Sequence, residues 1–172
     1  MELAELIKAN LWGCTDAEQG RQKLWDTVKN YVETHAVVTY SWAGIFDGTP
    51  DPLIVFSPCT ISTSSDPGLS SIVPQSTWNS VKSAVEAMTL LSQAMNSCAS
   101  TWLVQFPLGV LVSPALVLPT ITLAPLGSND GDAAMDSLCS SILSGLSACT
   151  PEIKGTHGVY TGAGVFTNIT IL

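Results

Sequence analysis

The end of the chain, GTHGVYTGAGVFTNITIL from Gly155 to Leu172, combines residue types that could do chemistry. Glycines can cradle a phosphate, and a histidine can move protons near neutral pH. A dinucleotide loop needs its glycines between a strand and a helix, because the amides of the helix N-terminus bind the pyrophosphate. Gly162-Ala163-Gly164 precedes only the segment 165–172, and no Walker Gly-Lys-Ser/Thr sequence occurs. We therefore expect these glycines to permit bulges or close backbone approach before a final strand, 165–172.

Histidine chemistry has two candidates, His35 and His157. Catalysis would require a nucleophile and an orienting carboxylate to converge on one of them. The sequence contains no G-x-S-x-G, H-E-x-x-H or Cys–His signature that predicts such convergence. His35 ends a predicted helix, where it meets the negative end of the dipole, and His157 is interpreted as a hydrogen-bonding loop residue. We predict no catalytic residue and keep a small intracellular enzyme using His157 as an alternative.

Metal and redox chemistry are also poorly indicated. The chain has five cysteines: Cys14, Cys59, Cys98, Cys139 and Cys149. They form no CxxC pair and have no histidine at metal-ligand spacing, and their odd number favours buried thiols over a closed disulfide framework. The sequence NDGD at 129–132 offers oxygen ligands for Ca²⁺ but lacks the rest of an EF-hand, so helix capping is preferred. We predict neither a metal nor a cofactor.

Composition narrows the classes of partner. Only 12% of the 172 residues are charged, 46% are hydrophobic, and the net charge is −8 with six Lys and Arg. Nucleic-acid binding needs clustered basic residues to displace counterions, so we predict no direct nucleic-acid contact. A surface this poor in ions indicates that neighbouring molecules cover part of it. The length predicts a single domain spanning 1–172.

Membrane insertion is not expected. The beginning, MELAELIKAN, is acidic and amphipathic rather than basic and then apolar, unlike a signal peptide. The segment 103–126 is uncharged and hydrophobic, but prolines interrupt it every five to seven residues. A membrane helix rarely tolerates that spacing, so we predict no membrane partner.

Helical periodicity is legible in four segments. A short helix at 2–11 precedes one at 15–35, which opens with a capping box of Thr15 and Glu18, so 1–34 forms an N-terminal helical segment. Further apolar stripes at helical spacing predict helices at 76–98, after Pro74, and at 132–149.

Strand-forming sequences fill the intervals. Residues 36–46 and 53–61 flank the turn DGTPDP, and 115–123 and 159–172 supply two more candidates. A hairpin mixed with helices favours an α+β class over strict βαβ winding. We expect a single domain with a mixed or antiparallel sheet of about four strands, packed with three to four helices.

Two segments resemble a known type of protein. AVVTYSWAGIFDGTPDP at 36–52 and GTHGVYTGAGVFTN at 155–168 resemble small structural proteins of tailed bacteriophages, in which a VVTYxW strand and a PDP turn are followed by a terminal HGxxTGxGV. The resemblance implies a non-enzymatic virion component, assembled in the host cytoplasm, of the tail, the head–tail connection or the capsid exterior. It implies other virion proteins as partners.

The sequence also indicates where contacts would lie. No charged residue occurs from Ala87 to Asn129, and an exposed apolar patch usually marks a protein–protein contact. We expect a homo-oligomer in which the final strand adds to the sheet of a neighbour. The expected interface residues are Trp102, Phe106, Leu108 and Val110 in the uncharged run, and Phe166 and Ile169 in the final segment. A host-surface binding module remains a further alternative.

Overall fold

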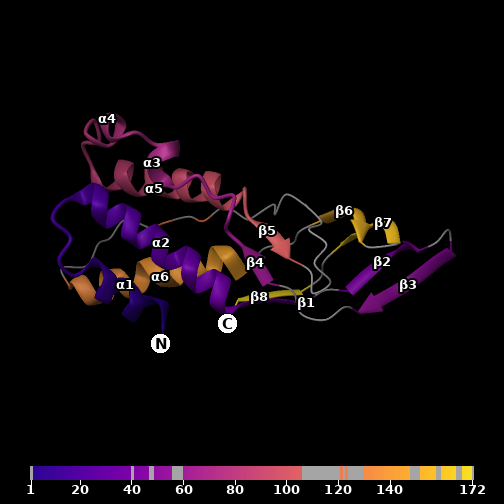
Figure 1. Cartoon of the computed structure of the whole chain (residues 1–172). Helices are drawn as coiled ribbons and strands as arrows, with labels where there is room; N and C mark the ends of the chain where they lie inside the picture. The colour runs from indigo at the N-terminus through magenta and orange to yellow at the C-terminus, as the bar shows by residue number, and fades with distance from the viewer. Residues whose placement is uncertain are drawn as a thin grey trace.

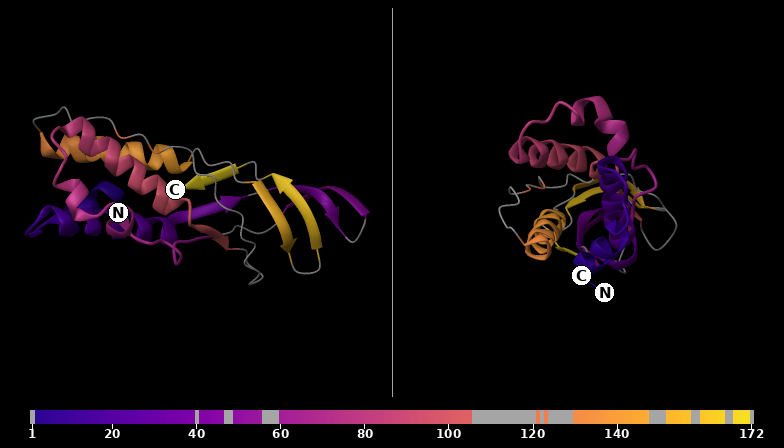
Figure 2. Two further views of the ribbon diagram at one scale, coloured as in Figure 1. Left: turned by 90° about the horizontal axis from the view of Figure 1, so that it is seen from above. Right: turned by 90° about the vertical axis from the view of Figure 1, so that its left-hand side faces the viewer.

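A computed structural model of the chain describes residues 2–39, 41–46, 49–55, 60–105, Ile121, Leu123, 130–147, 152–157, 160–165 and 168–171. Side chains are described for 2–36, 60–103, Ile121, Leu123 and 130–146. Helices gather at one end of an elongated molecule, and the hairpins project from the other (Figures 1 and 2).

The helical body contains six helices within the described residues: α1 Leu3–Leu11, α2 Ala17–His35, α3 Leu69–Ile72, α4 Gln75–Trp78, α5 Ala84–Ala99 and α6 Gly131–Ser147. The expected helices at 2–11, 15–35 and 132–149 are confirmed, with ends within two residues. The expected single helix at 76–98 is wrong, because α4 ends at Trp78 and Ser83 caps a new helix.

The reciprocal cap of α2 lies one residue later than the expected Thr15–Glu18 box. The Asp16 carboxylate accepts from the Gln19 backbone N–H at 2.8 Å, and the Gln19 side-chain oxygen accepts from the Thr15 N–H at 3.0 Å. Both versions satisfy the free N–H groups of the first turn, so sequence spacing alone does not separate them.

The strands pair antiparallel and two by two. The pairs are β1 Ala36–Thr39 with β8 Asn168–Ile171, β2 Ser41–Phe46 with β3 Thr49–Val55, β4 Thr60–Ser62 with β5 Leu103–Gln105, and β6 Glu152–His157 with β7 Tyr160–Val165. The β2–β3 pair forms a hairpin where one was expected, but the turn is shorter than DGTPDP, because Thr49–Pro52 already belong to β3, which pairs with β2. The expected strand at 36–46 is divided into β1 and β2, which pair with different strands, and the expected strand at 53–61 is divided between β3 and β4.

The expected α+β class, with a sheet of about four strands, is wrong. Helices hold 69% of the residues whose side chains are described, and β4 is the one complete strand among those residues. No sheet within the described residues has more than two strands. Residue composition predicts where strands form, but lateral pairing depends on contacts between distant segments, which composition does not specify.

The segment expected as a strand at 115–123 shows one reason for this difference. Most of that segment lies outside the described residues, but Ile121 and Leu123 are buried. Asn96 of α5 bonds both backbone polar groups of Ile121, and the Ser92 hydroxyl accepts from the Leu123 N–H at 3.0 Å. Side chains of a helix therefore satisfy backbone groups that the sequence assigns to a sheet.

Close packing against α6 fixes the same segment. A Cβ atom added at Gly145 would lie 2.9 Å from the Ile121 side chain, so only glycine allows this approach. The residues Ile121, Leu138, Cys139, Ile142 and Leu146 are all buried in this region.

The core centres on two stacked indoles. The ring centroids of Trp25 and Trp102 lie 5.4 Å apart, and both side chains are fully buried. Asp66 accepts hydrogen bonds from both indole N–H groups, at 3.0 Å from Trp25 and 2.6 Å from Trp102, and from the Gly68 N–H at 2.8 Å. This carboxylate therefore links the loop before α3 to α2 and to the residues after α5.

Polar contacts hold α1 against α6. The Lys8 ammonium lies 3.2 Å from Asp136, 3.5 Å from Asp132 and 3.6 Å from Glu5. The hydrogen bond to Asp136, supported by the neighbouring negative charges, raises the pKa of Lys8 despite partial desolvation.

Gly162 and Gly164, the glycines considered for a phosphate loop, lie inside strand β7. Gly162 pairs with Gly155 and Gly164 pairs with Ile153 in the β6–β7 ladder, so these glycines do not form a phosphate loop leading into a helix. The expected final strand at 165–172 is shorter, Asn168–Ile171, and β6 was not expected. None of the described helices is both long and apolar enough to cross a membrane.

Candidate functional site

The helical body carries a groove of about 530 Å³ along α4 and α5. Its lining includes Thr77, Val81, Lys82, Val85, Glu86 and Leu90. Val85 is 58% exposed, which is high for a branched apolar side chain. The groove therefore presents an apolar floor to the exterior.

The sequence of α5 explains why its apolar residues face two ways. Ser83 caps the helix by accepting from the Glu86 N–H at 3.1 Å, and the Glu86 carboxylate accepts from the Lys82 N–H at 2.8 Å. From this fixed start, Leu91, Met95 and other residues face the core, while Val85 lies on the outer side with Thr89. One helix thus contributes to both the core and the groove.

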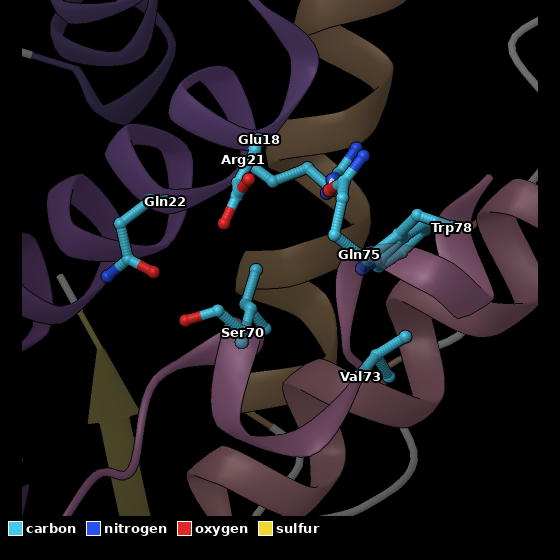
Figure 3. Close-up of a pocket in the computed structure, with 8 residues that line it drawn as sticks. Glu18, Arg21, Gln22, Ser70, Val73, Gln75 and Trp78 are labelled. Atoms are coloured by element: carbon cyan, nitrogen blue, oxygen red, sulfur yellow. Dashed lines mark hydrogen bonds between the residues drawn. The ribbon is translucent and has the colours of Figure 1, made fainter.

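A side-chain clasp holds α4 in place beside the groove. Arg21 extends from α2 toward Gln75 and Trp78 of α4 (Figure 3). Its guanidinium donates to the Gln75 side-chain oxygen at 2.6 Å and stacks over the Trp78 ring, 4.3 Å from the centroid. Gln75 in turn donates to the Asn79 side chain at 2.9 Å. The clasp therefore positions the wall of the groove that Thr77 and Val81 form.

The electrostatics of the clasp favour a structural role for Arg21. Partial burial lowers the pKa of Arg21, while the negative charges of Glu18 and Asp16 oppose that shift. The pocket that Arg21, Glu18, Gln22 and Trp78 line holds only about 10 Å³, which is room for roughly one water molecule. The Arg21 guanidinium already has two partners within the chain, the aromatic face of Trp78 and the side-chain oxygen of Gln75.

The second feature is an exposed indole between α1 and α2. Trp12 is 88% exposed, and it immediately follows α1. The Trp12 N–H donates to the Lys8 carbonyl at 3.3 Å, and the Cys14 N–H donates to the Leu11 carbonyl at 3.1 Å. Gly13, with φ of 81°, turns the chain in a conformation that other residues rarely adopt. The backbone that carries Trp12 is therefore fixed although its side chain faces solvent.

The expected interface residues have different outcomes. Trp102 is fully buried and bonded to Asp66, which makes it a core residue rather than a contact residue. Phe106, Leu108, Val110 and Phe166 lie outside the described residues. Ile169 lies in β8, where its backbone is paired with Val38 of β1, so the final strand already adds to a strand of its own chain.

The candidate chemical residues also have defined places. His157 is the last residue of β6 and pairs with Tyr160 across the hairpin, not in a loop. His35 ends α2 as expected, where its Nδ1 lies 3.1 Å from the Tyr31 carbonyl and its ring stacks on Tyr31. Asp130 caps α6 by accepting from the Asp132 N–H at 2.9 Å, as the capping interpretation expects.

The cysteines of the described residues are thiols. Cys98 and Cys139 are buried and Cys14 is half-buried, while Cys59 and Cys149 lie outside the described residues. Burial raises the pKa of Cys98 to about 12, helped by the negative charge of Asp66, and raises that of Cys139 to about 11. Within the described part of the chain, no three His, Cys, Asp or Glu side chains are grouped to hold a metal ion.

Comparison with known proteins finds no matching family model, no similar curated protein and no similar solved structure.

The interface residues expected from the sequence include neither Trp12 nor Val85, and Val85 lies on the apolar stripe that predicts the helix at 76–98. The sequence does contain one indication that Trp12 is exposed. It precedes Gly13 in the turn between two predicted helices, and turn residues lie at the surface. Val85 repeats at helical spacing with core residues of α5, so the sequence offers no signal that it faces outward.

Proposed function

We propose that this chain is a non-enzymatic structural protein of a tailed-phage virion, acting through contacts with copies of itself and with other virion proteins. The resemblance of segments 36–52 and 155–168 supports the virion part of the proposal. The proposed role in protein–protein contact rests on Trp12, whose side chain is exposed to solvent on an ordered turn of the backbone.

An indole left in water keeps a large apolar area unburied. Tryptophan is among the residues most enriched at the energetic centres of interfaces, where truncation costs at least about 2 kcal/mol. An indole that is 88% exposed contributes little to the stability of its own chain. Burial against a partner would use that apolar area, and the scarcity of surface charge fits the same role.

Purified particles of the virus that encodes the chain provide the test. We expect mass spectrometry to detect the protein in several copies per particle, and Trp12→Ala to reduce its incorporation. Ser97→Asp, an exposed change on α5 outside the groove, is the matched control and should be incorporated normally.

Absence of the protein from purified particles would overturn the proposal. Normal incorporation of Trp12→Ala, with loss of adsorption to host cells, would favour a host-surface binding module instead. A turnover that disappears in His157→Ala while incorporation persists would favour the enzyme alternative.

A further inference from the structure

We propose that two copies of this chain associate about a two-fold axis, with Trp12 of each copy inserted into the α4–α5 groove of the other. The inference rests on the proposed function and names the partner and the site of one self-contact. The following observations on shape, position and charge carry it.

Trp12 has the form of an anchor that needs little reorganisation. Hydrogen bonds at Lys8 and Leu11, and the positive φ of Gly13, fix the turn that presents the indole. Because the backbone is already ordered, binding costs mainly the rotamer freedom of the indole, which leaves more of its contact energy available as affinity.

The groove has the form of a receptor for such an anchor. It is an open depression of about 530 Å³ on the surface, wide enough to admit an aromatic side chain from outside. Val81, Val85 and Leu90 supply apolar contacts, and Thr77 and Thr89 supply hydroxyl groups at the margin. An indole combines a large apolar body with one N–H donor, which suits that lining.

The positions of the two features are compatible with a two-fold contact. The connection between α1 and α2 lies at the same end of the molecule as α4 and the beginning of α5 (Figures 1 and 2). A two-fold contact uses one self-complementary surface on both copies, so anchor and groove must share a side. A head-to-tail array would instead place them on opposite sides.

Charges beside the two features are complementary in part. Asp16 and Glu18 follow Trp12 closely in sequence and are exposed. Lys82 lines the groove and forms no ion pair within the described residues, whereas the Glu86 carboxylate beside it accepts from the Lys82 N–H. Contact of the acidic turn with Lys82 would be attractive, whereas Glu86 in the same groove and the net charge of −8 on each copy oppose it.

Sedimentation velocity over a range of concentrations, with the full chain, tests the inference. We expect the wild type to form a dimer, and Trp12→Ala and Val85→Asp each to weaken it about 30-fold or more, as for other central anchors. Ser97→Asp should dimerise like the wild type. Circular dichroism should show all variants folded, because each substituted side chain is exposed.

The decisive measurement mixes the two variants. Trp12→Ala keeps an intact groove, and Val85→Asp keeps an intact Trp12, so their heterodimer regains one of the two contacts. We expect the equimolar mixture to dimerise more strongly than either variant alone. This recovery would not occur if the indole and the groove bound different partners.

Three results would overturn the inference: a monomeric wild type at every concentration, a dimer unaffected by either variant, or a mixture that dimerises no better than its components. Each leaves the proposed function standing, because other virion proteins can still contact Trp12. Absence of the chain from particles would instead overturn the proposed function, whatever the dimer does.

Discussion

Asp66 is the residue on which the core depends most. It lies in a loop of small polar residues, yet its carboxylate accepts from the indoles of two fully buried tryptophans and from Gly68. Trp25 precedes it by 41 positions and Trp102 follows it by 36. One side chain therefore joins three distant segments, and the loop that carries it is structural.

Replacing Asp66 with asparagine should destabilise the protein by about 3 kcal/mol, because three donors would face a group that has only one acceptor oxygen. The midpoint of urea unfolding measures the loss, and near-ultraviolet circular dichroism reports the stacked indoles. Asp26→Asn is the control, since Asp26 is exposed and its ion pair with Lys29 should contribute about 1 kcal/mol or less. Equal losses in both variants would contradict the structural role of Asp66.

At the scale of elements, one carboxylate joins α2 to Thr63, the residue that follows β4. Glu33 accepts from the Thr63 backbone N–H at 2.8 Å and from the Thr63 hydroxyl at 2.7 Å. The hydroxyl and then the backbone hydrogen bond lower the pKa of Glu33 below its ordinary value of 4.5, against a small opposing effect of burial. The tie therefore favours the ionised carboxylate.

This lowered pKa predicts a pH dependence of stability. The folded state binds the Glu33 proton more weakly than the unfolded state, so the contribution is fully present above about pH 4.5 and is lost as pH falls through the folded pKa. At pH 7, Glu33→Gln should cost about 1 kcal/mol, with the discount that an exposed group requires. Urea unfolding of both proteins at pH 7 and below 4.5 should show the difference shrinking on acidification.

Glu2→Gln serves as the control, because Glu2 precedes α1 as its N-cap residue and its side chain makes no capping bond. A difference between wild type and Glu33→Gln that stays constant across that pH range would exclude an ionised hydrogen bond as its source. A double-mutant cycle with Thr63→Val would then show whether the two side chains interact at all.

How far the sequence predicts this molecule depends on the distance over which each feature is determined. The ends of α1, α2 and α6 follow from apolar spacing and capping residues within a few positions, so they are predictable. The break between α4 and α5 depends on whether Ser83 caps a helix or continues one, and both are compatible with the local pattern. β6 contains Lys154 and Gly155 and becomes a strand only through its pairing with β7.

The candidate site was less predictable than the helices. Exposure of Trp12 and Val85 depends on which faces of the helices the rest of the fold covers, and a single sequence gives only the hydrophobic pattern. Trp102 illustrates the reverse case. It lies within an uncharged run that favours an interface, but Asp66 and Trp25, both distant in sequence, bring it into the core.

At the scale of the whole molecule, β8 returns the end of the chain to the helical body. Four residue pairs join it to β1, which follows α2 directly, and Ala36 at the beginning of β1 is buried. If the final strand only contacted a neighbouring molecule, as the sequence predicts, removal of 165–172 would leave the fold of the chain intact. The pairing instead predicts that the shorter deletion of 168–172 also weakens the fold, because β1 loses this partner.

We expect the 168–172 deletion to increase hydrogen exchange at the backbone amides of β1, while amides in the centre of α5 remain protected, and to lower the thermal midpoint. Removal of Leu172 alone is the control, since it leaves the residue pairs Ala36–Ile171 through Thr39–Asn168 intact. Exchange depends on local opening, so it separates loss of this ladder from global unfolding. Unchanged exchange in β1 would show that β8 contributes nothing to its stability, and would return the final strand to consideration as a contact for a neighbouring molecule.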